Sequence, residues 1–421
     1  MSINRNVLSN NIGLKYKVLL LTSGQPSINP RLVKEADVLS DAGYDVTVLY
    51  VYWNDWATKF DTPLLQNKKW KAIRVGGDPY QQKTTYFFSR LIHKISRSII
   101  QKIGPVNMLS QIAISRGAYF LTREAKKHKA DLYIGHNMGA LAAVIKAAKK
   151  HNAKSGFDTE DFHRQEVSDD KNSLHYKNVK YLEDKYLSKA DYVTSASPQI
   201  ADAYQRLYPG IEPVSILNVF PQDTSVKKRT VNNGIIKLFW FSQTIGANRG
   251  LEEVIEALNR LNSNNIELHL LGNSNDSIKQ LFSNKAAAGK QQVFFHEPIL
   301  ADDLISFASQ FDIGLASENS TPLNRNICLT NKIFTYLQAG LTIIASDTTA
   351  QKAFLNEHPE VGKVYQKNDI QSLTNILSAY QADREFLHNT CTASLKLGRE
   401  KMNWENESKK FLQLVQTTLN T

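Results

Sequence analysis

Short apolar runs alternate with longer amphipathic stretches along the whole chain. The runs have the length of strands and are bounded by polar or glycine-containing segments, which is typical of strands buried in a parallel sheet. Several of the stretches between them have helical periodicity; one of these, residues 138–150, follows an apolar run almost directly. This alternation predicts an α/β protein. In the first half of the chain the predicted strands span residues 16–22, 45–51, 131–135, 153–157 and 191–197.

The same alternation restarts in the second half, after a polar break. Residues 221–234 lack periodicity and predict a linker. Two successive α/β series predict two Rossmann-like domains, whose ligands bind beyond the carboxyl ends of the strands. The second series consists of residues 236–242, 266–272, 292–296, 312–317 and 341–346. A closing helix is predicted from one apolar stripe, formed by Trp404, Phe411, Leu412, Val415 and Leu419.

Length and composition agree with two domains in a reducing compartment. A chain of 421 residues is too long for one ordinary core. Cys328 and Cys391 are too few for a disulfide framework or a metal cluster. No apolar run approaches the ~20 residues that span a bilayer, and residues 1–15 lack the apolar core of a secretory signal. We therefore expect a cytoplasmic protein.

The formal net charge of +11 is concentrated in one segment. Residues 81–130 contain ten Lys or Arg and a single acidic residue, Glu124. Within residues 83–103, apolar side chains recur at helical spacing, while basic ones fall on another face. Such a helix suits an anionic membrane surface; a helix packed on its own domain, with a solvated basic face, is the alternative. Nucleic acid is not an expected partner, because no nucleic-acid-binding motif accompanies the charge.

The segment TNKIFTYLQAGLTIIASD, residues 330–347, has the features of an anion-binding βαβ unit. Thr330 can cap a helix, Lys332 lies in its first turn, Gly340 can end it, and an apolar strand follows. The segment resembles the nucleotide-sugar signature of GT-B glycosyltransferases of the family-four type, which reads roughly NK(L/I)FEY(L/M)AAG.

This resemblance implies a GT-B fold, in which two Rossmann-like domains face a central cleft. Residues 1–222 would form the acceptor-binding domain and residues 235–399 the donor-binding domain, with a closing helix at about 400–421 packed back on the first. The protein would transfer a sugar from a nucleotide diphosphate sugar to a glycan or lipid-linked acceptor, in surface polysaccharide or glycoconjugate synthesis. The resemblance further implies a retaining hexosyltransferase that needs no metal or other cofactor. Residues 83–103 could hold it peripherally at the inner face of the cell membrane.

A second segment, residues 241–258, resembles the family's GRLxxxKG motif. Arg249 takes the place of the lysine, and a guanidinium can clamp a pyrophosphate through two parallel hydrogen bonds. The motif's arginine is replaced by Gln243 and Thr244, so Lys332 would supply the second cation. The resemblance therefore assigns Arg249 and Lys332 to catalysis, where they stabilise the leaving phosphate. A surface charge at a helix start is the alternative for Arg249.

The family's Glu-x7-Glu pair, which binds the donor, is missing from this sequence. Ile327 and Thr335 stand at its two positions, and Glu318, Asn326 or Asn331 could substitute. The full set of donor-binding candidates is Gln243, Thr244, Gly272, Asn273, His296, Glu318, Asn331 and Thr335.

Two loops of the first domain carry catalytic and acceptor-binding candidates. His136 follows a predicted strand, so it would point into the cleft and hydrogen-bond a sugar hydroxyl or the leaving phosphate. Gly24 would allow close approach of the backbone to a ligand. The alternatives are a structural histidine and a simple turn glycine.

The third candidate loop, FDTEDFHRQE at residues 157–166, resembles the family's DxHE region. Asp158, Glu160, Asp161 and His163 are its acceptor-binding candidates, since crowded carboxylates need cations or hydroxyl donors to offset their repulsion. A solvated acidic loop with Arg164 as counter-ion is the alternative. The cluster has no defined metal-ligand spacing, so no metal is expected.

Two other functions remain open. A sugar-nucleotide epimerase or hydrolase of the same fold would act on the donor without an acceptor. A non-catalytic nucleotide-binding or scaffold protein is compatible with the missing Glu pair and arginine.

Overall fold

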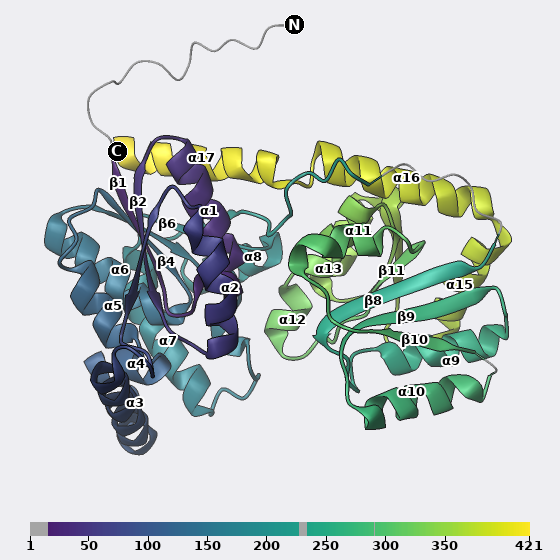
Figure 1. The fold of residues 1–421 in the computed structure, drawn as a ribbon, viewed down its shortest axis with the longest axis horizontal. Helices are drawn as coiled ribbons and strands as arrows, with labels where there is room; N and C mark the ends of the chain where they lie inside the picture. The colour runs from purple at the N-terminus through teal and green to yellow at the C-terminus, as the bar shows by residue number, and fades with distance from the viewer. Residues whose placement is uncertain (1–15, 227–233, 290) are drawn as a thin grey trace, which may run out of the picture.

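The structure, a computed structural model, describes residues 16–226, 234–289 and 291–421 and consists of two parallel α/β lobes that lie side by side (Figure 1). The N-terminal lobe is built on a seven-stranded sheet of order β3-β2-β1-β4-β5-β6-β7. The C-terminal lobe is built on a six-stranded sheet of order β10-β9-β8-β11-β12-β13. The fold class predicted from the sequence is therefore confirmed.

The strands of the N-terminal lobe are β1 (Lys17–Thr22), β2 (Asp45–Val51), β3 (Lys71–Val75), β4 (Leu132–His136), β5 (Lys154–Asp158), β6 (Tyr192–Ser195) and β7 (Val214–Ser215). Its helices are α1 (Pro30–Asp41), α2 (Asp55–Gln66), α3 (Lys83–Ile103), α4 (Asn107–Ile114), α5 (Ala118–Ala125), α6 (Met138–His151), α7 (Leu174–Tyr186) and α8 (Pro198–Leu207).

The strands of the C-terminal lobe are β8 (Ile236–Thr244), β9 (Ile266–Asn273), β10 (Val293–His296), β11 (Ile313–Ala316), β12 (Thr342–Ser346) and β13 (Gly362–Tyr365). Its helices are α9 (Leu251–Leu261), α10 (Asp276–Ala287), α11 (Leu304–Ala308), α12 (Leu323–Ile327), α13 (Asn331–Ala339), α14 (Thr349–Glu357), α15 (Ile370–Ala382) and α16 (Arg384–Glu400), followed by the closing helix α17 (Trp404–Asn420).

All ten predicted strands are present, with ends that differ from the predicted ones by at most two residues. The strands β3, β7 and β13 were not predicted, because they are short and β3 is largely exposed at a sheet edge. The first helix has Pro30 at its first position, and the Asn29 side chain caps it by accepting from Leu32 N at 3.1 Å. Part of the predicted linker, residues 227–233, lies outside the described residues, as does the N-terminal segment 1–15.

The closing helix α17 runs from the C-terminal lobe along the N-terminal lobe, at the top of Figure 1. At its start, Trp404 N donates to Phe220 O at 2.9 Å. Further along, Phe411 and Val415 are fully buried in the same hydrophobic cluster as Leu32 of α1. The last helix of the chain therefore stabilises the core of the first lobe.

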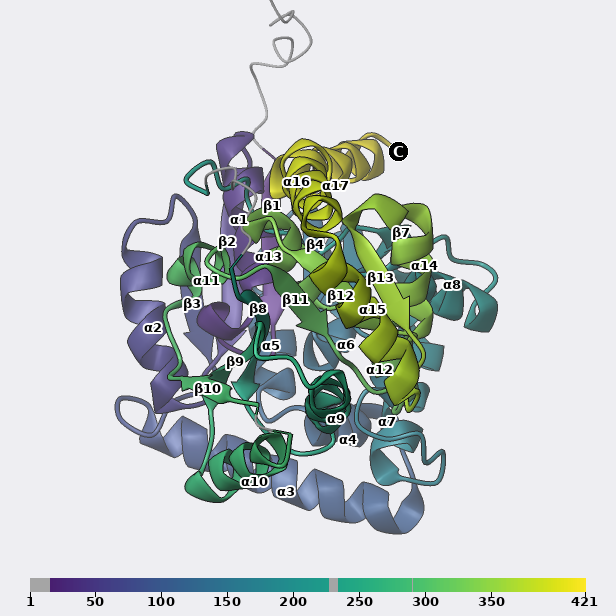
Figure 2. The same cartoon turned by 90° about the vertical axis from the view of Figure 1, so that its right-hand side faces the viewer.

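The helix α3 lies at the opposite end of the molecule from α17, as both views show (Figures 1 and 2). Five large apolar side chains of α3 are exposed, namely Phe87, Phe88, Leu91, Ile95 and Ile103. No helix in the described parts of the chain is both long enough and apolar enough to cross a bilayer.

The short helix α12 of the C-terminal lobe docks on the N-terminal lobe. Asn324 Oδ1 accepts from Phe162 N at 2.7 Å, and the same side chain donates to Asp161 Oδ1 at 2.8 Å. Ser197 Oγ donates to Ile327 O at 2.7 Å. Because Phe162 and Asp161 belong to the 157–166 loop, the Asn324 contacts bring the predicted acceptor loop up against α12, which precedes α13.

Candidate active site

Two cations of the C-terminal lobe lie beside the indole of Trp240, a fully buried residue of β8. The Arg249 guanidinium carbon lies 5.6 Å from the centre of this ring, and Lys332 Nζ lies 5.2 Å from it. Arg249 comes from the loop between β8 and α9, and Lys332 from the first turn of α13. The two positions that the sequence assigns to the leaving phosphate are thus brought together, beyond the end of a parallel strand.

The two cations differ in their partners. Lys332 Nζ lies 2.5 Å from Glu318 Oε1 and is buried. Arg249 is half-buried and donates from Nη2 to Ser242 Oγ at 3.0 Å, and no carboxylate pairs with it within the described chain. Arg249 is therefore the cation that an anionic ligand would find uncompensated.

The remaining donor candidates divide into exposed and buried residues. Gln243, Thr244 and Asn273 are exposed at the ends of β8 and β9, and Asn331 is exposed at the start of α13. Gly272 has a φ of +148°, and a Cβ there would lie 2.2 Å from Ser242 O, so only glycine fits. These five residues surround the same strand ends as Arg249.

Thr335 and His296 are less accessible than their predicted role requires. Thr335 is fully buried within α13, and its hydroxyl has no hydrogen-bond partner in the described chain. His296 contacts His269 at 3.0 Å and packs against Phe307 and Phe311, so it is part of an aromatic cluster. Their donor-binding role stays a prediction.

At the start of α13, Thr330 occupies the predicted N-cap position, but its side chain makes no capping hydrogen bond.

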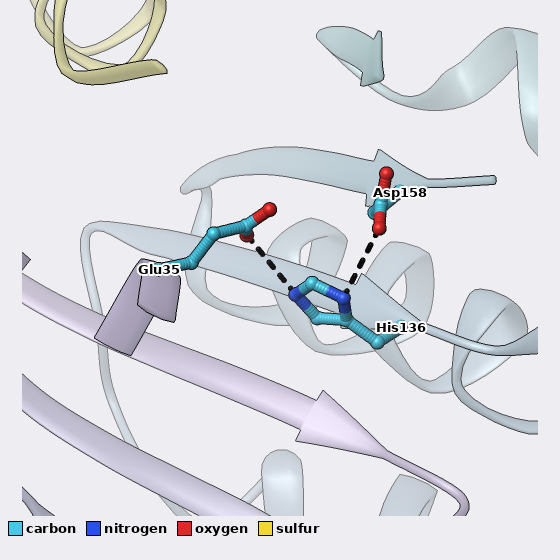
Figure 3. A group of neighbouring side chains, drawn as sticks. All are labelled: Glu35, His136 and Asp158. Carbon is cyan, nitrogen blue, oxygen red and sulfur yellow. Dashed lines mark ion pairs between the residues drawn. The ribbon is translucent and has the colours of Figure 1, made fainter. Parts of the chain in front are cut away.

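In the N-terminal lobe, His136 lies at the end of β4 as predicted, but it is fully buried rather than open to the cleft. Figure 3 shows the imidazole between two carboxylates. Its Nε2 lies 3.1 Å from Glu35 Oε2, and its Nδ1 lies 3.3 Å from Asp158 Oδ2. The expectation of an accessible side chain is wrong, because these two ion pairs, from α1 and β5, hold the ring inside the lobe.

A second cation completes this buried cluster. Arg31 Nε lies 2.6 Å from Asp158 Oδ2 and 3.7 Å from Glu35 Oε1. Asp158 Oδ1 also accepts from Thr194 Oγ1 at 2.8 Å. Asp158 is thus a fully buried, multiply paired residue and not a group that faces an acceptor.

The charges of this cluster balance when His136 is protonated. Burial alone would lower the pKa of His136, but Glu35 and Asp158 outweigh it and raise this pKa to about 10. Burial would raise the pKa of Asp158, but Arg31 and His136 hold it well below its usual value. Glu35, His136 and Asp158 have ligand atoms close enough for a metal ion. The Arg31 guanidinium, however, already supplies positive charge at both carboxylates.

Two of the predicted acceptor-binding carboxylates, Glu160 and Asp161, are partly accessible. Both are half-buried, and Glu160 has a φ of +47°, which is uncommon for a residue other than glycine. Burial, together with the charges of Asp161 and Asp158, raises the pKa of Glu160 to about 7. A carboxyl group in this state can accept or donate a proton near neutral pH.

His163 is more enclosed than expected of an acceptor ligand. It is buried, and its Nδ1 lies 2.9 Å from Glu166 Oε2. Burial would lower the pKa of His163, but Glu166 and Asp161 raise it to about 9. The neighbouring Arg164 pairs with buried Glu183 at 2.7 Å, so it is not a solvated counter-ion.

Cys328 connects the acidic loop with the donor side. Burial raises the pKa of its thiol, with further contributions from Asp161, Glu160 and Glu318. Cys328 itself is half-buried and lies directly after α12, the helix that docks on the N-terminal lobe.

Within the protein, the close-packed glycine near this loop is Gly139, whereas the ligand-binding role of Gly24 stays a prediction. A Cβ on Gly139 would lie 2.5 Å from Ser23 Cβ and 2.6 Å from Ser115 Cβ, whereas one on Gly24 would make only an ordinary contact with Ile28. The predicted loop is thus a close-packed region, but the glycine that permits the packing is at the start of α6.

Sequence reasoning missed Arg31, Glu35 and Trp240. Arg31 and Glu35 are four residues apart on a helix whose apolar positions include Leu32 and Ala36. Charges that flank an apolar stripe at this spacing are a signal for a buried pair, although they do not reveal its partners. Trp240 stands inside an apolar strand and had no such signal.

No protein-family model and no curated protein matched the chain significantly. Solved structures match it over nearly the whole length. A glycosyltransferase from Rickettsia africae has 13% identity and a TM-score of 0.65, covering 96% of this chain and 99% of its own. Sucrose-phosphate synthase from Thermosynechococcus elongatus has 14% identity and a TM-score of 0.67, covering 96% and 98%. HepE from Anabaena, solved in complex with UDP-glucose, has 15% identity and a TM-score of 0.66, covering 96% and 100%. The chain therefore has the GT-B fold.

Proposed function

We propose that this chain of GT-B fold is a glycosyltransferase that moves a sugar from a nucleotide diphosphate sugar to a glycan or lipid-linked acceptor. The observation that carries the proposal is the guanidinium of Arg249. It is stacked beside Trp240 at the end of β8 and lacks a carboxylate partner within the described residues. The similar structure of HepE from Anabaena contains UDP-glucose, and that of TarM from S. aureus contains UDP with a glycosylated glycerol. Both support a sugar nucleotide as donor.

The proposed mechanism is electrostatic. As the sugar leaves, negative charge develops on the diphosphate, and Arg249, with Lys332 and the N-terminus of α13, stabilises it. The proposed mechanism uses no metal ion; Arg249 supplies the positive charge that the described residues leave uncompensated, because Lys332 is paired with Glu318. With retention of configuration, the departing phosphate takes the proton of the acceptor hydroxyl on the same face. Glu160 would hold the acceptor by hydrogen bonds.

We further propose that the protein works at the inner face of the cell membrane, in surface polysaccharide or glycoconjugate synthesis. The exposed apolar side chains of α3 support the membrane contact, with Lys83 and Lys102 of the same helix as its cations. A similar structure, WaaG, is described as a glycosyltransferase of lipopolysaccharide biosynthesis. Vesicle flotation with and without phosphatidylglycerol tests this contact.

The experiment that tests the function is a donor-consumption assay. The protein is incubated with a panel of nucleotide diphosphate sugars, with and without a membrane and glycan extract that contains candidate acceptors. We expect release of nucleoside diphosphate that depends on the extract, together with incorporation of labelled sugar. Release without any acceptor would indicate a hydrolase or epimerase instead.

A non-catalytic nucleotide-binding protein is the second candidate. Two observations favour it: Thr335 is fully buried where the family has a donor-reading Glu, and Lys332 is already neutralised by Glu318. Such a protein would bind UDP or another nucleotide in calorimetry and release no sugar from any donor.

A further inference from the structure

A cavity of about 860 Å³ lies in the N-terminal lobe, between α3, α7 and the loops that follow β1 and β2. The carboxyl ends of parallel strands are where ligands of such sheets bind. The cavity is separate from the two cations beside Trp240, since all its lining residues belong to the N-terminal lobe. Its basic lining residues are Arg90, His93, Lys94, Arg97, Arg116 and His175.

These basic groups have no acidic counterpart in the cavity. No Asp or Glu of the described residues lines it. Arg90, Lys94 and Arg97 follow one another at helical spacing on α3 and form no ion pair with any described residue. The charge of three neighbouring cations is therefore not balanced by the protein itself.

Arg116 forms the inner wall and is fixed by neutral groups. Its Nη1 donates to Gly76 O at 2.7 Å and to Ser89 Oγ at 2.6 Å, and its Nη2 donates to Tyr52 O at 2.6 Å. The guanidinium also stacks on Tyr86, at 4.7 Å from the ring centre. A half-buried cation that is oriented by four neutral contacts is preorganised for an anion.

Other lining residues are polar and aromatic. Ser23 and Ser115 add hydroxyl groups, and both side chains pack against Gly139 in the first turn of α6. Tyr52 and Trp53 provide aromatic surface, and amphipathic aromatic rings suit a ligand with both polar and apolar parts.

We propose that this cavity binds a phosphate or pyrophosphate group carried by the acceptor substrate. The proposal deepens the proposed function and rests on it, because it names the chemical class of the acceptor. It differs from attraction to a membrane surface, which the same helix offers through Lys83 and Lys102, two cations that do not line the cavity.

Inorganic pyrophosphate is the probe for this site. Its binding is measured by calorimetry on the full chain in the presence of saturating UDP, so that the donor pocket is occupied. We expect the double variant Arg90→Gln/Arg97→Gln to bind pyrophosphate at least tenfold more weakly than the unmodified protein. The matched control, Lys83→Gln/Lys102→Gln, removes two charges from the same helix and should bind it within about twofold.

Three outcomes would overturn the proposal: no pyrophosphate binding by the unmodified protein, equal binding by the Arg90/Arg97 variant, or equal losses in both variants. A parallel arm measures binding to phosphatidylglycerol vesicles. If the Arg90/Arg97 variant loses vesicle binding and keeps pyrophosphate binding, the cations serve a lipid surface and the acceptor proposal fails. UDP binding is recorded separately, so that a protein without a donor site is distinguished from one without an acceptor-phosphate site.

Discussion

Nζ of Lys332 lies 2.5 Å from Oε1 of Glu318, and this ion pair leaves Arg249 as the uncompensated partner of the two cations beside Trp240. The pair has a direct consequence for ligand affinity. A diphosphate that approaches Lys332 has to compete with a carboxylate that is already in place. Glu318 therefore either weakens donor binding or serves as the donor-reading residue that the sequence suggested.

The substitution Glu318→Gln distinguishes these roles. It removes the competing charge and keeps the shape, so we expect UDP to bind about three- to tenfold more tightly, measured by calorimetry. Glu256→Gln, an exposed residue of α9 in the same lobe, should leave the affinity unchanged. Weaker binding by Glu318→Gln would show that this carboxylate contacts the donor itself.

Arg249→Ala tests the leaving-group role. We expect kcat to fall by about 10²–10³-fold, the range for loss of one electrostatic contact in the transition state. The melting temperature should change little, because the half-buried side chain contacts the described residues through one hydrogen bond, to Ser242, and its position beside the Trp240 ring. Arg249→Lys should recover part of the rate, since it restores charge without the bidentate geometry. Unchanged turnover in Arg249→Ala would exclude this residue from the chemistry.

Asp158→Asn tests the buried charge cluster of the N-terminal lobe. The substitution leaves Arg31 and His136 with one buried carboxylate, Glu35, between them. We expect the free energy of unfolding to fall by about 3–5 kcal/mol, as when one partner of a buried ion pair is removed. Asp41→Asn, which breaks an exposed pair with Lys69, should cost less than about 1 kcal/mol. Urea unfolding measures both, and equal effects would contradict a structural role for the cluster.

The sequence was sufficient for the fold because the signals of parallel strands are local. The run at residues 45–51 is mostly apolar, and its bounds agree with those of β2. Strand β3 has two exposed residues among its five and is only weakly distinguished from a loop. A short edge strand obtains its stability from one neighbour, which a single sequence does not show.

The site was less predictable, because its contacts join distant segments. His136 was placed correctly at a strand end, but its burial depends on Glu35, which comes from another helix. Similarly, the residues near Lys332 in the sequence do not predict its ion pair with Glu318. They also do not predict that Lys332 and Arg249 both lie beside Trp240. The spacing of residues along the chain predicts which helix or strand carries a side chain. It does not predict the partners from distant segments that determine whether this side chain is protonated or exposed.

Stability should fall as the pH rises above neutrality. His136 and His163 have pKa values raised to about 10 and about 9 in the folded protein. For a base whose pKa is raised, the stabilisation is fully present below its unfolded value, near 6.5, and is lost as the pH rises through the folded value. Asp158 has the opposite sign: its pKa is lowered, so its contribution is lost when the pH falls below its usual value.

Urea unfolding between pH 6 and pH 10 measures this dependence. We expect the free energy of unfolding to decrease progressively over the range, and His163→Gln to show a smaller decrease between pH 7 and pH 9. His388→Gln, a histidine of α16, serves as the control and should follow the unmodified protein. A decrease between pH 7 and pH 9 that is as large in His163→Gln as in the unmodified protein would contradict a protonated, buried His163.

Glu160 provides a test of the acceptor side through the pH profile of the reaction. Its pKa is raised to about 7 by burial and by the charges of Asp161 and Asp158, so the carboxyl group loses its proton near neutral pH. If the ionised form holds the acceptor hydroxyl, kcat/KM rises with pH and levels off above about 7. In Glu160→Gln we expect kcat/KM to be lower and this rise to disappear, while the affinity for UDP stays the same. A variant that keeps the same profile would show that another group titrates, and a loss of UDP affinity would place Glu160 on the donor instead of the acceptor.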